Sequence, residues 1–278
     1  MRFVALLLTA GLAACATVPP AAWEPRLRGD AVVLLGEVHD NGDQHRLRLA
    51  VLRRAFAAGW RPAIAMEQFD REHQADIERA RRERPADAQH VIDLAAPAAQ
   101  GGAGSGWTWD FYRPYVALAL QYDVPLLAAN LANADTTKIA RGGVAAVFDR
   151  AAIDELGLGR PIDGAWQAAQ EHEIDAGHCR ALPREVWPRM ARAQFARDAV
   201  MARVVAGHAD RGVVLLAGNG HVRRDLGVPR WLAVDPARVL AVAFLEVDDD
   251  ATPIDAFDAV VRTAVAERSD PCAGFKRR

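Results

Sequence analysis

The chain has 278 residues, of which 51% are apolar and 25% are charged, and its formal net charge at neutral pH is −2. This is the balance of an ordinary globular protein that is long enough to bury a core in one large domain or two small ones. Nucleic-acid-binding proteins typically carry an excess of basic residues, and this chain has none. We therefore expect no nucleic-acid partner.

The first fifteen residues, MRFVALLLTAGLAAC, have the pattern of a bacterial lipoprotein leader. Arg2 precedes an apolar stretch over residues 3–14, which is roughly half of what a membrane-spanning helix needs and suits a secretory signal peptide. The tetrapeptide LAAC at 12–15 resembles a lipobox, and the alternative is an ordinary signal peptide followed by a chance cysteine.

The lipobox interpretation divides the chain into three parts. We expect a signal peptide over residues 1–14, a lipidated tether over 15–29 and a single α/β domain over 30–278. Ala16 stands where an inner-membrane retention signal would have Asp, so the expected location is the cell envelope, lipid-anchored through Cys15 in the outer membrane and facing the periplasm.

Short apolar runs alternate with amphipathic stretches through the rest of the chain. The runs with strand character cover residues 31–37, 62–69, 124–131, 212–221, 238–247 and 256–264. The stretches with helical spacing cover 43–59, 71–84, 114–123 and 189–207, while 96–107 is a small-residue loop and 152–183 holds helical pieces and a His-rich turn. Continuous apolar strands separated by helices predict an α/β fold, with a mainly parallel β-sheet covered by helices on both faces.

Ionisable and amide side chains follow four of the predicted strands where each strand ends. They are Glu37 and His39, then Glu67, then Asn130, and finally His221. The carboxyl ends of parallel strands share one edge of a sheet, so we expect these side chains in one crevice. Each of these residues has an ordinary structural explanation. A group of buried carboxylates and histidines, however, lowers the stability of the fold unless the side chains are paired with each other or serve a functional site.

Two chemistries would use this set. Glu37, His39, Glu67 and His221 could hold a divalent metal that activates water, or the same residues could act as general acid and base without a metal. We expect His45, Asn130, Arg197 and Asp198 to surround them, with Arg197 and Asp198 pairing with the carboxylates. His39 and His45 are six positions apart, so they are not the i,i+4 ligand pair of a zinc-protease helix.

Residues 106–122, GWTWDFYRPYVALALQY, concentrate every tyrosine of the chain. Tyr112 and Tyr115 would share a helix face, which fits either a well-packed aromatic helix or the wall of a flat apolar pocket. In the second case a Tyr112 phenolate could ligate ferric haem iron and Arg113 could pair with a propionate. His172 and His178 are alternative axial ligands, and a shallow haem site would favour a homodimer that forms on haem binding.

Two cysteines remain after Cys15. An oxidising compartment permits a disulfide between Cys179 and Cys272, and two free thiols are equally consistent with the sequence.

Seven segments in order over residues 30–247 resemble one known family. They are LLGEVHDN, AMEQF, YRP, LAAN, HC followed by LP, AQFARDAVMA and AGNGHVRRDLGVP. Together they resemble the ChaN-type haem-binding uptake lipoproteins, which belong to a superfamily with the Tiki proteins and erythromycin-esterase-like enzymes.

The resemblance implies an α/β domain, an outer-membrane lipid anchor, haem binding coupled to dimerisation and no settled enzymatic activity. Enzymatic relatives use positions that match Glu37, His39 and Glu67, and relatives tend to have Gly where this chain has Arg180. The sequence therefore predicts an outer-membrane lipoprotein that binds haem for iron uptake or storage, with a metal-dependent hydrolase as the alternative.

Overall fold

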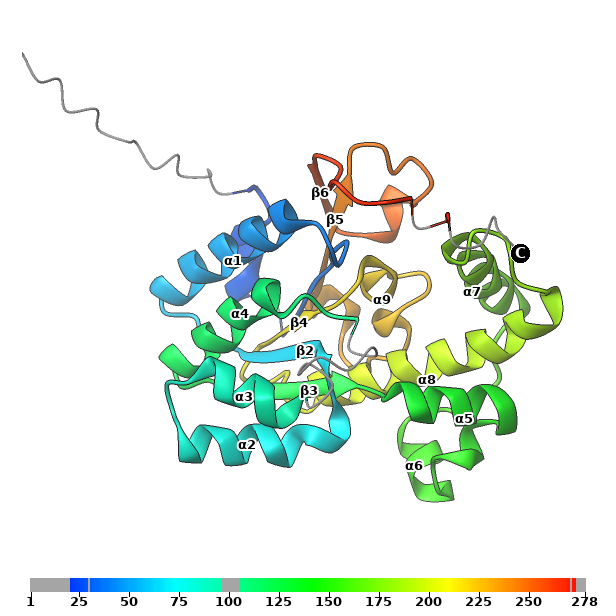
Figure 1. Cartoon of the computed structure of the whole chain (residues 1–278), viewed down its shortest axis with the longest axis horizontal. Coiled ribbons are helices and arrows are strands. Elements are labelled where there is room, and N and C mark those ends of the chain that lie inside the picture. The colour runs from blue at the N-terminus through cyan, green and yellow to red at the C-terminus, as the bar shows by residue number, and fades with distance from the viewer. Residues whose placement is uncertain (1–20, 30, 97–105, 271, 274–278) are drawn as a thin grey trace, which may run out of the picture.

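The computed structural model describes residues 21–29, 31–96, 106–270 and 272–273, so the predicted signal peptide and Cys15 lie outside the described residues. Six strands form one parallel sheet in the order β3-β2-β4-β1-β5-β6 (Figure 1). The strands are β1 (Val32–Leu35), β2 (Ala63–Asp70), β3 (Leu126–Asn130), β4 (Val213–Leu216), β5 (Val239–Glu246) and β6 (Ala259–Thr263). This confirms the expected fold class.

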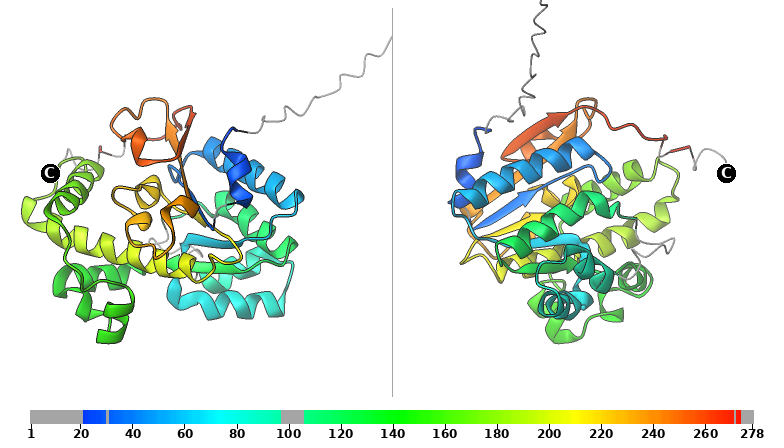
Figure 2. Two further views of the ribbon diagram at one scale, coloured as in Figure 1. Left: turned by 180° about the vertical axis from the view of Figure 1, so that it is seen from behind. Right: turned by 60° about the vertical axis from the view of Figure 1, so that its left-hand side comes forward.

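Helices cover both faces of this sheet (Figures 1 and 2). They are α1 (Gly42–Ala57), α2 (Gln74–Glu83), α3 (Ala88–Ala95), α4 (Trp109–Gln121), α5 (Asn133–Gly142), α6 (Arg150–Glu155), α7 (Gly164–Gly177), α8 (Trp187–Ala206) and α9 (Asn219–Val222). The first four helices pack over one face, α8 crosses the other, and α5 to α7 pack around α8 at the outer edge of the fold.

The alternation of strand side chains explains why both faces are apolar. In β1, Val33 and Leu35 enter the core beneath α1, α3 and α4, while Val32 and Leu34 enter the core beneath α8. All four are fully buried, as expected for a central strand with side chains on alternate faces. The continuous VVLL run is therefore the sequence signature of this position.

The last residues of the predicted tether pack against the domain. Residues Glu24–Arg28 form a short 3-10 helix (η1), and Leu27 is 1% exposed in the core beneath α1. Glu24 also pairs with Arg54 of α1 at 2.6 Å. An apolar anchor and an ion pair therefore dock this segment onto the domain.

The helices and strands differ from the sequence prediction in three places, at two boundaries and in one additional helix. The fourth strand stops at Leu216, and the Gly-Asn-Gly-His segment turns into α9 instead of continuing the strand to His221. Helix α4 begins at Trp109, five residues earlier than predicted, and continues through Pro114, which removes one i→i−4 hydrogen bond from the helix interior. Helix α3 was not predicted; Asp87 caps it by accepting a hydrogen bond from the backbone of His90.

Over the ranges that the structure describes, no helix combines the length and the apolar character needed to cross a membrane.

Candidate functional site

The site is built where β1, β2 and β4 end, and a bulge in β2 shapes it. Met66 pairs with Ala128 and Asp70 with Asn130, so four residues of β2 advance against two of β3. Such a bulge re-aims the side chains within it, which here include Glu67 and Gln68. Gln68 is 4% exposed, and among the described residues neither atom of its amide has a hydrogen-bond partner.

Glu37, directly after β1, is the centre of a buried hydrogen-bond network. The Tyr112 hydroxyl donates to its Oε1 at 2.5 Å, and Nδ1 of His39 lies 2.8 Å from the same oxygen. Arg48 of α1 forms an ion pair with Oε2, and both side chains are fully buried. Burial favours the neutral acid, but Arg48, His39 and His45 outweigh it and lower the pKa of Glu37. Glu37 is therefore an ionised acceptor.

His45 stacks behind this carboxylate in its neutral form. Its Nε2 donates to the His39 carbonyl at 3.0 Å, while its Nδ1 lies 3.7 Å from Oε2 of Glu37. Burial and the nearby Arg48 charge lower the pKa of His45 to about 4. The ring also packs against Phe111, with ring centroids 4.7 Å apart. His45 thus supports the loop that carries His39.

A second group joins β2, α8 and α9. Nδ1 of His221 lies 2.5 Å from Oδ1 of Asp198, and its Nε2 lies 3.4 Å from Oε1 of Glu67. Burial alone would lower the pKa of His221, but the two carboxylates raise it to about 10, and the pKa of Glu67 is lowered in return, against the effect of burial. Because both ring nitrogens face acceptors, His221 is an imidazolium held between two acids.

Gly218 connects the two groups by close approach. Its N–H donates to Oε2 of Glu67 at 2.8 Å, and a Cβ at this position would lie 3.1 Å from Nε2 of His39. A Cβ on Gly36 would meet Oδ1 of Asn219 at 2.2 Å, so a side chain has no room there. These two glycines allow the ends of β1 and β4 to close onto each other.

His39 is the member of the site that reaches solvent. Its side chain is 45% exposed and its ring packs edge-on against Trp107, with centroids 4.7 Å apart. Burial would lower the pKa of His39, yet the hydrogen bond to Glu37 and the charge of Glu67 raise it. Since Nδ1 donates to Glu37, its Nε2 is the nitrogen that can exchange a proton. The site can therefore perform acid–base chemistry through His39.

The structure brings together Glu37, His39, Glu67 and His221, with Asp198 and His45 around them. These side chains are not arranged as the ligands of one metal ion, because the carboxylates and imidazoles are already paired with each other. Within the described ranges, no group of three or more His, Cys, Asp or Glu side chains is arranged to hold a metal ion.

Three of the expected neighbours have partners other than those predicted. Asp198 pairs with His221 and not with a carboxylate, and Arg197 donates to Asn133 at 2.5 Å. The Oδ1 of Asn130 accepts from the Leu131 backbone, so this side chain ends its own strand. The expected pairing of Arg197 with the crevice carboxylates is therefore wrong, because its guanidinium reaches the start of α5.

The aromatic helix packs into the core, and the first choice of haem ligand lies on its buried side. Tyr112 and Tyr115 are fully buried in the core, and Tyr115 donates to the His45 carbonyl at 2.8 Å. Burial and the adjacent Glu37 raise the pKa of Tyr112 far above its usual range. A buried phenol that donates to a carboxylate is not a phenolate on the wall of an open pocket. The Arg113 guanidinium pairs with Asp110 on the same helix at 2.9 Å.

The two histidines of α7 differ in their surroundings. His172 lines a surface hollow of about 420 Å³. Its other lining residues are Ala168, Glu171, Asp175, Arg184 and Trp187. His178 instead ends the helix, where its Nδ1 donates to the Ile174 carbonyl at 2.7 Å. The α7 hollow thus brings together an exposed imidazole, an indole and a guanidinium.

Sequence reasoning missed several residues of both places. Arg48 was detectable, since it lies on the buried face of α1 at helical spacing from His45 and Leu52. Arg184 and Trp187 lie i,i+3 apart at the start of α8, but nothing in the sequence links them to His172 on α7.

The chain matches one family model over residues 24–232, described as haem-binding uptake, Tiki superfamily, ChaN. A solved structure of ChaN from Campylobacter jejuni, described as showing cofacial heme binding, superposes with a TM-score of 0.61 at 19% identity. The match covers 80% of this chain and 84% of that one.

An erythromycin esterase, EreC, in its open conformation gives a TM-score of 0.41 at 14% identity, over 80% of this chain and 72% of that one. No curated protein sequence matches the chain. The similarity to the Campylobacter jejuni structure establishes the shared fold.

Proposed function

The chain belongs to the ChaN family of haem-binding uptake proteins in the Tiki superfamily, and on that premise we propose that it is an envelope lipoprotein that binds haem for uptake or storage of iron. The observation that carries the proposal is the α7 hollow, where His172, Arg184 and Trp187 meet. These three side chains match the three chemical parts of haem, which are the iron, the propionates and the flat ring.

Each side chain has a definite role in that fit. The imidazole of His172 is a common axial ligand for haem iron. The guanidinium of Arg184 suits a carboxylate, and it already lies 5.2 Å over the Trp187 ring, so cation and indole form one surface. The indole offers an apolar plane against which a porphyrin can pack. Bound haem would supply the iron coordination chemistry, while the chain supplies the ligand and the orientation.

The position of the α7 hollow suits an assembly of two copies. Helix α7 lies at the outer edge of the fold, away from the sheet (Figure 1). A haem on so shallow a surface keeps one face open, and a second copy can cover that face with the same surface patch. We therefore propose that haem binding drives formation of a homodimer, which sedimentation with and without hemin would detect.

Hemin titration of the purified protein tests the haem site. His172→Ala should weaken hemin binding by more than about tenfold and change the absorption spectrum, because the axial ligand is lost. The matched control is His90→Ala, since His90 pairs with Glu83 on α2 and should leave binding intact. Wild-type affinity and spectrum in His172→Ala would reject this site, and no binding by the wild-type chain would reject the function.

The lipid anchor is a separate part of the proposal and rests on the LAAC tetrapeptide at 12–15. Cys15→Ser should block lipid attachment and release the protein from membranes, because the acyl chains carry the membrane affinity. Membrane fractionation of cells that express the two forms measures this. Equal membrane retention of both forms would contradict the anchor.

A second candidate function, hydrolysis, is favoured by the paired acids of the crevice. The buried Glu67 and Asp198 hold His221 charged, and the exposed His39 stands beside them as an acid–base group. Hydrolysis of simple aryl esters by the wild type, with loss in Glu67→Gln and not in Glu78→Gln on the α2 surface, would support it. Equal rates in both variants would exclude a catalytic crevice.

A further inference from the structure

The described residues beyond β6 cross the carboxyl edge of the sheet and reach the end of α7. In Figures 1 and 2 this segment runs from β6 past the strand ends toward α7. We call residues 264–270 together with Cys272 the C-terminal strap. The strap touches the site at its start and α7 at its end, so it physically connects the crevice to the helix that carries His172.

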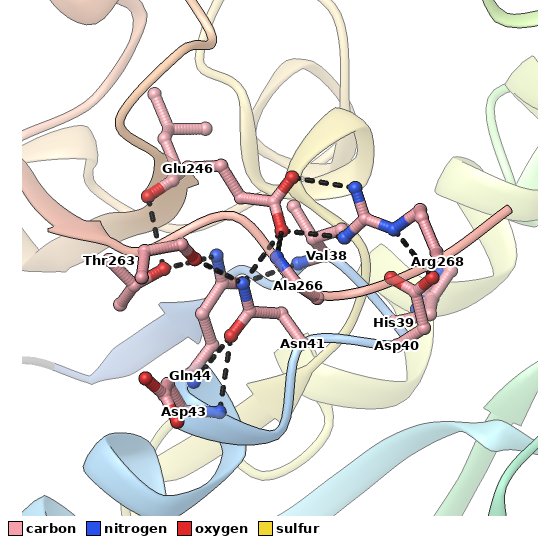
Figure 3. Close-up of polar contacts among 12 residues, drawn as sticks. Val38, His39, Asp40, Asn41, Asp43, Gln44, Glu246, Thr263, Ala266 and Arg268 are labelled. Atoms are coloured by element: carbon pink, nitrogen blue, oxygen red, sulfur yellow. Dashed lines mark hydrogen bonds and ion pairs between the residues drawn. The ribbon is translucent and has the colours of Figure 1, made fainter. Parts of the chain in front are cut away.

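Glu246, the last residue of β5, is the anchor of the strap. Its carboxylate is 6% exposed and accepts from Arg268 at 2.5 and 2.7 Å, from the Ala266 backbone at 2.8 Å and from Asn41 at 2.7 Å. Hydrogen bonds from Arg268 lower the pKa of Glu246 to about 2, although partial burial opposes this. A carboxylate with four donors is an ionised and well-ordered attachment point (Figure 3).

The same arginine reaches the loop that carries His39. Nε of Arg268 donates to Oδ2 of Asp40 at 2.7 Å, and Asn41 donates to the Ala264 carbonyl at 2.9 Å. Asn41 also caps α1 by accepting from the backbones of Asp43 and Gln44 at 3.1 Å. Figure 3 shows that both residues following His39 are thus held by the strap. The loop joins β1 to α1, and the strap holds the two residues that precede α1.

A disulfide fastens the far end of the strap. Cys272 is bonded to Cys179, which follows α7, with Cα atoms 5.6 Å apart. Both cysteines are half-buried, so the bond is within reach of a small thiol. Cys179 and Arg180 both have positive φ, near +58° and +55°, which is uncommon for residues other than Gly. A glycine at position 180 would adopt this turn more easily than the arginine does.

We propose that the C-terminal strap is a thiol-sensitive clamp that positions the His39 loop and the end of α7 together. With the disulfide closed, both ends of the strap are fixed, and Arg268 holds Asp40 and Glu246 in place. A dithiol reductant opens the clamp: the S–S bond takes up two electrons and two protons to give two thiols, and the reductant becomes a disulfide. The strap is then held only by its contacts with Glu246, Asp40 and Asn41, without a fixed far end, and both the loop and α7 loosen.

Arg268 is a positioning residue in this scheme, and the consequence for haem rests on the proposed function. Opening the clamp releases the helix that carries His172, so hemin affinity should fall several-fold on reduction. The movement of the His39 loop does not depend on haem, and it is measured without hemin. A wild-type chain that fails to bind hemin would therefore reject the proposed function while leaving the clamp to be judged by itself.

Hydrogen exchange of the soluble mature chain, read by mass spectrometry, tests the clamp. The peptide over residues 37–47 should exchange at least about fivefold faster after reduction with dithiothreitol, in the double variant Cys179→Ser/Cys272→Ser, and in Arg268→Ala, which keeps the disulfide. Arg268→Lys should restore part of the protection, because an ammonium can still reach Glu246. Arg238→Ala is the control, since the Arg238 side chain belongs to the turn before β5 and lies outside the strap.

The peptide over α2, residues 74–83, serves as the internal reference in each sample. Faster exchange confined to residues 37–47 and the end of α7 supports the clamp. Unchanged exchange of residues 37–47 in both the cysteine and the Arg268 variants would overturn it. Equal acceleration in α2 would overturn it too, because the strap would then act on global stability.

Discussion

Tyr112→Phe separates a structural role of this tyrosine from a role in haem ligation. The substitution removes one oxygen from a fully buried ring, so it creates little cavity and leaves the packing of α4 intact. The lost hydroxyl donates to Oε1 of Glu37 at 2.5 Å, and that acceptor is ionised. A buried hydrogen bond to a charged group contributes about 1.5–3 kcal/mol, so unfolding free energy should fall by that amount.

Tyr115→Phe is the matched control, because it removes the same atom from the same helix. Its hydroxyl donates to the neutral carbonyl of His45 at 2.8 Å, and such a bond contributes about 0.5–1.5 kcal/mol. Urea unfolding followed by tryptophan fluorescence should therefore show a larger decrease of the midpoint for Tyr112→Phe, with an unchanged slope. Both variants should keep the wild-type hemin affinity.

Two results would refute this reasoning. A cost for Tyr112→Phe no greater than that for Tyr115→Phe would mean that the charge of Glu37 does not strengthen the bond. Loss of hemin binding in Tyr112→Phe, with stability retained, would mean that the phenol leaves the core to ligate iron, as the sequence alone suggested.

Two further predictions concern the buried charges. The pKa of His221 is about 10 in the folded chain against 6.5 in the unfolded chain, so its charge stabilises the fold fully below pH 6.5. This contribution should disappear as the pH rises toward 10. The urea midpoint should therefore decline across that range in the wild type and decline less steeply in His221→Gln. Arg48→Met should cost about 3–5 kcal/mol because it leaves Glu37 buried without its cation, and adding Glu37→Gln should recover most of the loss in thermal or urea unfolding.

The sequence predicted the sheet well because its signal is local and repeated. The VVLL runs of β1 and β4 are apolar at every position, which a strand buried on both faces requires. It also indicated which side chains lie near one another, since Glu37, Glu67 and His221 lie at or just beyond the carboxyl ends of strands that share one edge.

The roles of those residues were less predictable because they depend on non-local contacts. The sequence allowed Tyr112 either in a well-packed helix or on a pocket wall, and only the position of Glu37 beneath α4 shows where its hydroxyl finds a partner in the core. The docking of Leu27 was hidden for a similar reason, because it looks like an isolated apolar residue until α1 covers it. The Cys179–Cys272 disulfide could not be chosen from the sequence, because it joins segments 93 residues apart.

The place of β1 in the sheet governs when the site can come into existence. Val32 pairs with Val213 on one side and with Val239 on the other, so the first strand made finds both neighbours near the end of the chain. Strand pairings across so long a sequence separation form slowly, because the entropy cost of closing a large loop comes before the favourable contacts between the strands. Until then β1 presents two unpaired apolar edges, which expose a nascent or truncated chain to aggregation. The crevice lies at this β1–β4 junction, so its appearance would mark the completion of folding.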